Sequence, residues 1–249
     1  MVNGIESFRE KFAGYEDCYT IIGGTACDIL MSEADFDFRQ TRDIDMILIL
    51  EDKREAFAKT FWEYIKEGGY RCGWKNNDEA HFYRFTEPKS GYPLMIELFS
   101  RRQGYHLEVE EGIIPVHIDD EISSLSAILL DDDFYNFMLS GRKEVNGLSV
   151  LGAEYIIPFK MYAWLDLKAK KANGEHVNER DLKKHKNDVF RLLQIVNADG
   201  HIGVEGLVRE SIENFIQDIQ SETIRTEQFG LLITKDESLE ILRNIYLNA

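Results

Sequence analysis

Two aspartates separated by one residue, Asp43 and Asp45, are the side chains in this sequence best placed to do chemistry. They open a short apolar run, Met46 to Leu50, which has the composition of a buried strand. Side chains alternate between the faces of a strand, so both carboxylates point the same way. Two like charges held side by side repel unless a cation neutralises them, and Mg²⁺ is commonly held by carboxylates together with substrate phosphates. The pair is therefore a candidate magnesium site, with a solvated strand end as the ordinary alternative.

A Gly-Gly-Thr segment, Gly23-Gly24-Thr25, follows another apolar run, Tyr19 to Ile22. Glycine permits positive φ and lets a ligand approach the backbone. A helix that begins here offers unpaired N–H groups and a positive dipole end to a phosphate. Thr25 would cap that helix or contact a phosphate oxygen. A Gly-Gly pair alone most often marks a turn, but its combination with the two aspartates indicates a phosphate site beside a metal site.

A third carboxylate, Glu97, stands in the middle of the apolar segment Tyr92 to Ser100. An ionised carboxylate buried in a strand is costly unless a cation neutralises it or its pKa rises. That cation is either a metal ion or a nearby base such as Arg101 or Arg102. Another acidic pair, Asp35 and Asp37, precedes no sustained apolar run and is assigned to a loop.

The elements that must position these residues are predicted from periodicity and from Gly, Asn and Asp breakers. Further strands are expected at 70–74, 81–85, 112–118, 124–130 and 145–151, the last of these around Gly147. Helices are expected at 5–15, 28–31, 53–67, 134–139, 153–171, 180–196, 204–219 and 237–247. Because the pattern changes near Gly152, we predict an α+β fold, with a mixed sheet and flanking helices in a domain spanning 1–150 and a helical C-terminal domain spanning 151–249.

The combination of Gly23-Gly24-Thr25 with Arg39, Thr41 and Asp43-Ile44-Asp45 resembles the signature of the polymerase-β-type nucleotidyltransferase superfamily. Within it, the pattern is most similar to the AbiEii-like branch, which includes toxins of type IV toxin–antitoxin systems. The resemblance implies a nucleotidyltransferase-type sheet and a catalytic domain in the first 150 residues.

The resemblance also assigns roles to residues. The glycines and Thr25 would hold a nucleoside triphosphate, ATP or another NTP, and the Asp43–Asp45 pair would bind two Mg²⁺ ions. Glu97 would be the third metal ligand or the base for the acceptor hydroxyl, although the superfamily more often has Asp there. The basic residues that would neutralise phosphate are Arg39 or Arg42 and Lys160.

Two features of the second half also resemble the branch. Lys160 stands near the start of a predicted helix, as a family lysine that packs toward the active site does; an ordinary exposed lysine is the alternative. Asp188 matches the first acid of a late Lys/Arg-x-Asp-x-x-Asp motif, but Arg191 occupies the place of the second acid. Asp188 would position a base, a lysine or a water, or would pair with Arg191 three residues later on the helix.

Composition limits the classes of protein. A net charge of −16 argues against a broad nucleic-acid surface. The most basic segment either forms a solvated pair of helices or binds the phosphates of a nucleic-acid acceptor. Its residues are Lys168, Lys170, Lys171, Arg180, Lys183, Lys184 and Lys186.

No apolar run reaches the roughly 20 residues of a membrane helix, so we expect no membrane association. The three cysteines lack metal-type spacing and are expected to be buried thiols in the reducing cytoplasm; they are Cys18, Cys27 and Cys72.

These observations predict an enzyme that transfers a nucleoside monophosphate from an NTP to a hydroxyl of RNA, protein or a small molecule by a two-metal mechanism. A toxin with a co-encoded antitoxin partner is the narrower form of this hypothesis. The alternatives are a catalytically inactive nucleotide-binding or scaffold protein of the same fold, and a phosphotransferase that moves the γ-phosphate.

Overall fold

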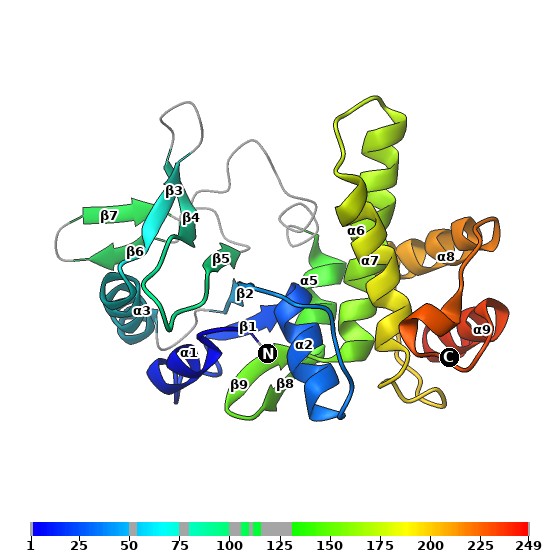
Figure 1. Cartoon of the computed structure of the whole chain (residues 1–249), viewed down its shortest axis with the longest axis horizontal. Coiled ribbons are helices and arrows are strands. Elements are labelled where there is room, and N and C mark those ends of the chain that lie inside the picture. The colour runs from blue at the N-terminus through cyan, green and yellow to red at the C-terminus, as the bar shows by residue number, and fades with distance from the viewer. Residues whose placement is uncertain are drawn as a thin grey trace. The chain divides into compact units, whose positions relative to one another are not determined.

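The computed structural model describes residues 2–49, 54–74, 80–99, 106–109, 112–115 and 131–248. The chain divides into two compact units (Figure 1). The first unit comprises Met1–Ile122 and Arg142–Leu151, and the second comprises Ser123–Gly141 and Gly152–Ala249.

The first unit is built on a mixed sheet with the strand order β3-β4-β5-β2-β1-β9-β8. The strands are β1 (Tyr19–Ile22), β2 (Asp43–Leu48), β3 (Arg71–Trp74), β4 (Ala80–Thr86), β5 (Met95–Phe99), β8 (Arg142–Val145) and β9 (Leu148–Leu151). The pairs β2–β5 and β1–β9 are parallel, whereas the other neighbours are antiparallel. A separate hairpin pairs β6 (His106–Val109) with β7 (Gly112–Pro115).

One face of the central strands is covered by aromatic side chains from two helices, α1 (Ile5–Lys11) and α3 (Arg54–Gly68). The rings in contact belong to Phe8, Phe12, Tyr19, Phe57 and Phe61, with centroids 4.4 to 6.4 Å apart. All five are buried. Burying each such side chain stabilises the fold by about 1.5–3 kcal/mol, so this cluster anchors the sheet.

The same face carries Ile44, Met46 and Leu48 of β2, and the opposite face carries Asp43 and Asp45 together with the buried Ile47. Residues opposite each other on neighbouring strands share a face. Ile21 lies opposite Met46 and Tyr19 opposite Leu48, all of them buried. The alternate positions of β2, including Asp43 and Asp45, therefore point to the face away from the aromatic cluster.

The prediction of one strand over 145–151 was wrong in its extent, because the segment contains the end of β8, a turn and the whole of β9. β8 and β9 pair antiparallel around Asn146 and Gly147, which have φ of 51° and 73°. An Asn-Gly pair with positive φ at both central residues forms the tight turn that fits the twist of two adjacent strands. The hairpin carries the chain back to the sheet, where β9 lies beside β1 (Figure 1).

The second unit consists of helices within the described residues. They are α5 (Asp132–Ser140), α6 (Ala153–Ala172), α7 (Glu179–Leu192), α8 (Gly206–Gln220), a 3₁₀ turn η1 (Thr226–Phe229) and α9 (Lys235–Tyr246). The side chains of Asp131, Asn178 and Thr234 accept hydrogen bonds at the N-termini of α5, α7 and α9. Such caps stabilise a helix by about 0.5–2 kcal/mol each, so these helix starts are encoded locally.

Most predicted elements are confirmed, including the α+β class, the mixed sheet with flanking helices and the helical C-terminal region. The predicted strand at 124–130, the end of the strand at 112–118, Leu50 and Lys53 lie outside the described residues. The division into domains at residue 150 stays a prediction; in the compact units, α5 belongs with the later helices and the β8–β9 hairpin with the sheet. Among the described residues, no helix has the length and apolar character needed to cross a membrane.

Candidate nucleotide and metal site

Strand β2 places the two aspartates where their carboxylates share one face of the sheet. Asp43 and Asp45 are half-buried and alternate with Ile44 and Met46, which are fully buried. On the parallel neighbour β5, Glu97 lies directly opposite Asp45. Opposed residues of paired strands share a face, so the structure brings all three predicted carboxylates to the same side of two adjacent strands.

The first glycine of the Gly-Gly-Thr segment lies against Asp45. Helix α2 (Gly23–Glu33) begins directly after β1, and Gly23 has a φ of +67°. A Cβ at Gly23 would overlap the Oδ2 atom of Asp45. Both the backbone conformation and the space therefore require glycine here. The start of a helix, with its partial positive charge, meets an aspartate of the predicted metal site.

Replacing Gly23 with alanine is expected to destabilise the protein and to disturb Asp45. The positive φ alone costs about 1–2 kcal/mol of unfolding free energy for a residue with a Cβ. Gly14→Ala is the matched control, because Gly14 has a φ of +85° but no atom within 4 Å of the point that an added Cβ would occupy. In urea unfolding, Gly23→Ala should lose more stability than Gly14→Ala, and only Gly23→Ala should weaken Mn²⁺ binding. Equal losses with unchanged Mn²⁺ binding in both variants would show that the Asp45 carboxylate is not held against this glycine.

The third residue of the segment, Thr25, connects the helix to the aspartate strand. Its fully buried hydroxyl donates a hydrogen bond to the backbone carbonyl of Asp43. Thr25 does not cap α2, since the N-cap is Ile22 and no side chain caps that end. The hydroxyl therefore holds the start of α2 at a fixed place beside Asp43, and its predicted contact with a phosphate stays a prediction.

A basic residue and a buried hydroxyl flank the second glycine. A Cβ at Gly24 would lie 2.9 Å from the Thr41 methyl and 3.1 Å from an Arg39 guanidinium nitrogen. Arg39 also lies over the Phe38 ring, at 5.0 Å from its centroid. The Thr41 hydroxyl is buried and has no hydrogen-bond partner among the described residues. Arg39 is thus beside the helix start as a phosphate site requires, whereas Arg42 is exposed.

Glu97 faces the same side as Asp45 but is held by a base. The Nε atom of Arg84, on β4, donates to Oε1 of Glu97 at 2.5 Å. Arg84 is also the residue opposite Glu97 in the β4–β5 register. A salt bridge was the alternative reading of Glu97; its partner is Arg84, and Arg101 and Arg102 lie outside the described residues.

Asp43, Asp45 and Glu97 lie on neighbouring strands, but their carboxylates do not converge into a metal-binding group of three. Asp45 lies against Gly23, which follows β1, whereas Glu97 contacts Arg84 on β4. In the part of the chain that the structure describes, no group of three or more His, Cys, Asp or Glu side chains is arranged to hold a metal ion. The backbone of Arg84 lies on the far side of β5 from Asp45, since β5 separates β4 from β2.

The donor set at β2 nevertheless fits a hard divalent cation. Two carboxylates on one strand face, beside a helix start that attracts phosphate, provide the oxygen ligands that Mg²⁺ takes together with a triphosphate. The residues that would hold such an ion are Asp43 and Asp45. Glu97 as a third ligand stays a prediction, because its Oε1 atom is engaged by Arg84.

The two predicted site residues of the second unit form a buried ion pair. Lys160 on α6 is 4% exposed, and its Nζ lies 3.1 Å from Oδ2 of Asp188 on α7, which is fully buried. Arg191 also reaches Asp188, with Nη1 at 3.3 Å from Oδ1. The exposed-lysine reading of Lys160 was wrong, and the pairing of Asp188 with Arg191 is confirmed. As members of the catalytic site, Lys160 and Asp188 stay predictions.

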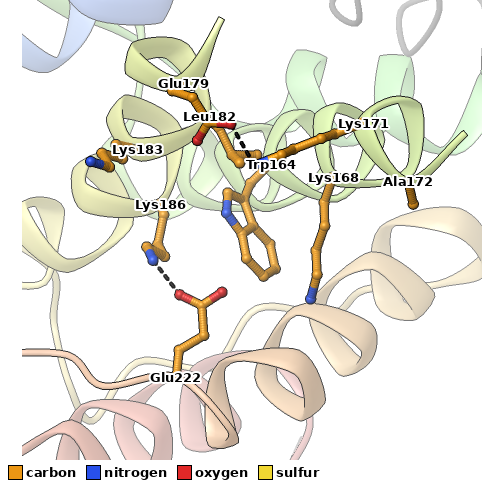
Figure 2. Close-up of a pocket in the computed structure, with 9 residues that line it drawn as sticks. All are labelled: Trp164, Lys168, Lys171, Ala172, Glu179, Leu182, Lys183, Lys186 and Glu222. Carbon is orange, nitrogen blue, oxygen red and sulfur yellow. Dashed lines mark hydrogen bonds and ion pairs between the residues drawn. The ribbon is translucent and has the colours of Figure 1, made fainter. Parts of the chain in front are cut away.

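Four lysines of the basic segment, Lys168, Lys171, Lys183 and Lys186, line a hollow in the second unit, and carboxylates among the described residues pair with three of the four (Figure 2). Lys171 pairs with Glu179, Lys186 with Glu222, and Lys168 with Asp218. Lys168 also lies over the Trp164 ring at 4.7 Å. These pairs favour a solvated helix surface over tight binding of nucleic-acid phosphates, because the paired carboxylates reduce the positive charge that would attract a polyanion.

The sequence pattern assigns no role to two residues that lie beside the candidate site, Thr41 next to Gly24 and Arg84 next to Glu97. The sequence carries no direct sign of Arg84, because its importance arises from the register of β4 against β5. The expected buried thiols are confirmed for Cys18 and Cys27, and the side chain of Cys72 lies outside the described residues.

Comparisons with known proteins found a similar chain among solved structures, whereas no protein-family model and no curated protein matches the chain. Among solved structures, this chain is similar to the antibiotic-resistance factor ANT(2'')-Ia. The solution structure of that protein was described as revealing substrate-regulated conformation dynamics. The two chains are 12% identical, the match covers 88% of this chain and 90% of that chain, and the TM-score is 0.38.

Proposed function

We propose that this protein is a metal-dependent nucleotidyltransferase. The observation that carries the proposal is the contact between Gly23 and Asp45, which joins a phosphate-binding helix start to a carboxylate pair on one strand face. Arg39 beside Gly24 adds positive charge at the same helix start. The resemblance of this motif to the polymerase-β-type superfamily supports the same reading, and within it the AbiEii-like branch remains part of the proposal.

The proposed reaction moves a nucleoside monophosphate. The oxygen of an acceptor hydroxyl forms a bond to the α-phosphorus of the NTP, the bond from that phosphorus to the bridging oxygen breaks, and pyrophosphate leaves. The hydroxyl proton passes to a base, for which the resemblance implies Glu97. A divalent ion at Asp43 and Asp45 would supply charge neutralisation and orientation of the triphosphate. Arg39 and the N–H groups of Gly23 and Gly24 would bind phosphate oxygens.

Labelled nucleotides test the reaction directly. The protein should transfer label from α-labelled NTP, in the presence of Mg²⁺, to a component of total RNA, total protein or a set of small hydroxyl compounds. Label at the γ-position should appear only in pyrophosphate. Transfer of the γ-label to an acceptor would instead select the phosphotransferase alternative. Omission of the divalent ion is the control and should stop the transfer.

The inactive alternative is favoured by one specific observation. Glu97 is engaged by Arg84, and this pair leaves the third carboxylate less accessible for catalysis. A protein that kept the fold and lost turnover would bind NTP in calorimetry but transfer no label to any acceptor. Product formation with any acceptor would remove this alternative.

The toxin role is the narrow form of the proposal. Expression in a bacterium should then arrest growth, and a co-encoded partner protein should relieve the arrest. Growth that continues normally while the purified protein transfers label would remove the toxin role and leave the enzyme.

A further inference from the structure

Three side chains form a row across neighbouring strands of the sheet. Asp45 on β2 lies opposite Glu97 on β5, and Glu97 lies opposite Arg84 on β4. Because residues in register share a face, the row presents acid, acid and base side by side on the face that carries the candidate site. Arg84 therefore belongs to the site by position as well as by contact.

The contact between Arg84 and Glu97 is close and partly shielded from water. The Nε–Oε1 distance is 2.5 Å, and the side chains are 46% and 14% exposed. An arginine keeps its charge throughout the usable pH range, and its planar guanidinium carries five N–H donors. Among the described residues, Arg84 uses one donor on Glu97, and the guanidinium has further N–H groups of the kind that suit a phosphate oxygen.

A second divalent ion at Glu97 would meet this guanidinium. The ion would need the carboxylate oxygens of Glu97, one of which Arg84 already engages. Two cations held on the same carboxylate repel each other strongly where water is partly excluded. At Asp43 and Asp45 the described residues place Gly23 and a helix start nearby, a setting that suits a metal bound together with phosphate.

We propose that Arg84 serves as the second cation of this site, so that the protein binds one divalent ion, at Asp43 and Asp45, and uses the Arg84 guanidinium to bind a phosphate of the nucleotide. The proposal rests on the proposed nucleotidyl-transfer function. It departs from the two Mg²⁺ ions that the family resemblance implies, because Glu97 is paired within the protein itself.

Counting bound ions tests the proposal without measuring activity. Free Mn²⁺ is followed by electron paramagnetic resonance while it is titrated into the full chain with a saturating α,β-methylene analogue of ATP. The wild-type protein should bind one Mn²⁺ per chain. Arg84→Met should bind a second ion, and Arg84→Lys should still bind one. Arg84→Met should also weaken binding of the analogue at saturating Mn²⁺ by about tenfold, the effect of one lost charge-assisted hydrogen bond.

Two further variants keep the test decisive. Arg71→Met is the matched control, because Arg71 is an exposed arginine on the adjacent strand β3 and pairs with Glu87; it should bind one ion with unchanged affinity for the analogue. Glu97→Gln should still bind one ion. This variant keeps the proposal testable even if Arg84→Met does not fold.

Two ions in the wild type, with one lost in Glu97→Gln, would overturn the role of Arg84 and leave nucleotidyl transfer standing. A single ion in a folded Arg84→Met variant would also overturn it. No Mn²⁺ in the wild type would reject the metal site and the proposed function together.

Discussion

Replacing Asp45 with asparagine is expected to lower the rate of nucleotide transfer by about a thousandfold, because the loss of a metal ligand removes several kcal/mol of transition-state stabilisation. Asp45 is the carboxylate that lies against Gly23 and opposite Glu97. The amide has nearly the same shape, so the space beside Gly23 stays filled. Transfer of α-labelled nucleotide, with the variant and the wild type at equal concentration, measures the effect.

Asp37→Asn provides the matched control for that experiment. Asp37 belongs to the second Asp-x-Asp pair in the sequence, with Asp35, and both side chains are exposed in the loop before β2. The same chemical change there should leave transfer within about twofold of wild type, since surface substitutions away from a site have small effects. If Asp45→Asn retains transfer at the level of Asp37→Asn, the carboxylate pair on β2 is not the catalytic metal site.

The largest expected effect on stability comes from the buried pair in the second unit. Asp188→Asn should lower the free energy of unfolding by about 3–5 kcal/mol, because it leaves the buried ammonium of Lys160 without its counter-charge. Lys160→Met should also destabilise, but less, since Asp188 keeps its contact with Arg191. The double variant Lys160→Met, Asp188→Asn should recover part of the loss, because it buries no unpaired charge. Urea unfolding followed by circular dichroism gives the three values.

An exposed ion pair in the same unit serves as the comparison. Lys168 and Asp218 are 44% and 38% exposed, so Lys168→Met should cost less than about 1 kcal/mol. If Asp188→Asn lowered the free energy of unfolding as little as Lys168→Met does, the Lys160–Asp188 pair would not stabilise the fold. A catalytic role for the pair would then be the remaining reason for burying two charges.

The local parts of the site followed from the sequence. Strand β2 was expected from its apolar run, and the alternation of side chains along a strand placed Asp43 and Asp45 on one face. The helix after Gly23 was expected from the glycines and the apolar residues that follow. These properties depend on residues that are neighbours in the chain, so a pattern of a few residues is enough to predict them. The Asn146-Gly147 pair is an equally local turn signal, although the apolar residues on both sides of it predict one continuous strand.

The pairing of distant strands and helices was decided only by the tertiary structure. No spacing in the sequence states that β5 lies between β2 and β4, or that Glu97 stands in register with both Asp45 and Arg84. Burial of the Lys160 ammonium against Asp188 likewise depends on how α6 packs on α7. Register and packing are set by the fit of the whole core, because a slip of one residue would turn every side chain of a strand to the wrong face. The sequence by itself therefore determined which residues carry charge and which face of β2 they share, and the folded chain decided which opposite charges meet.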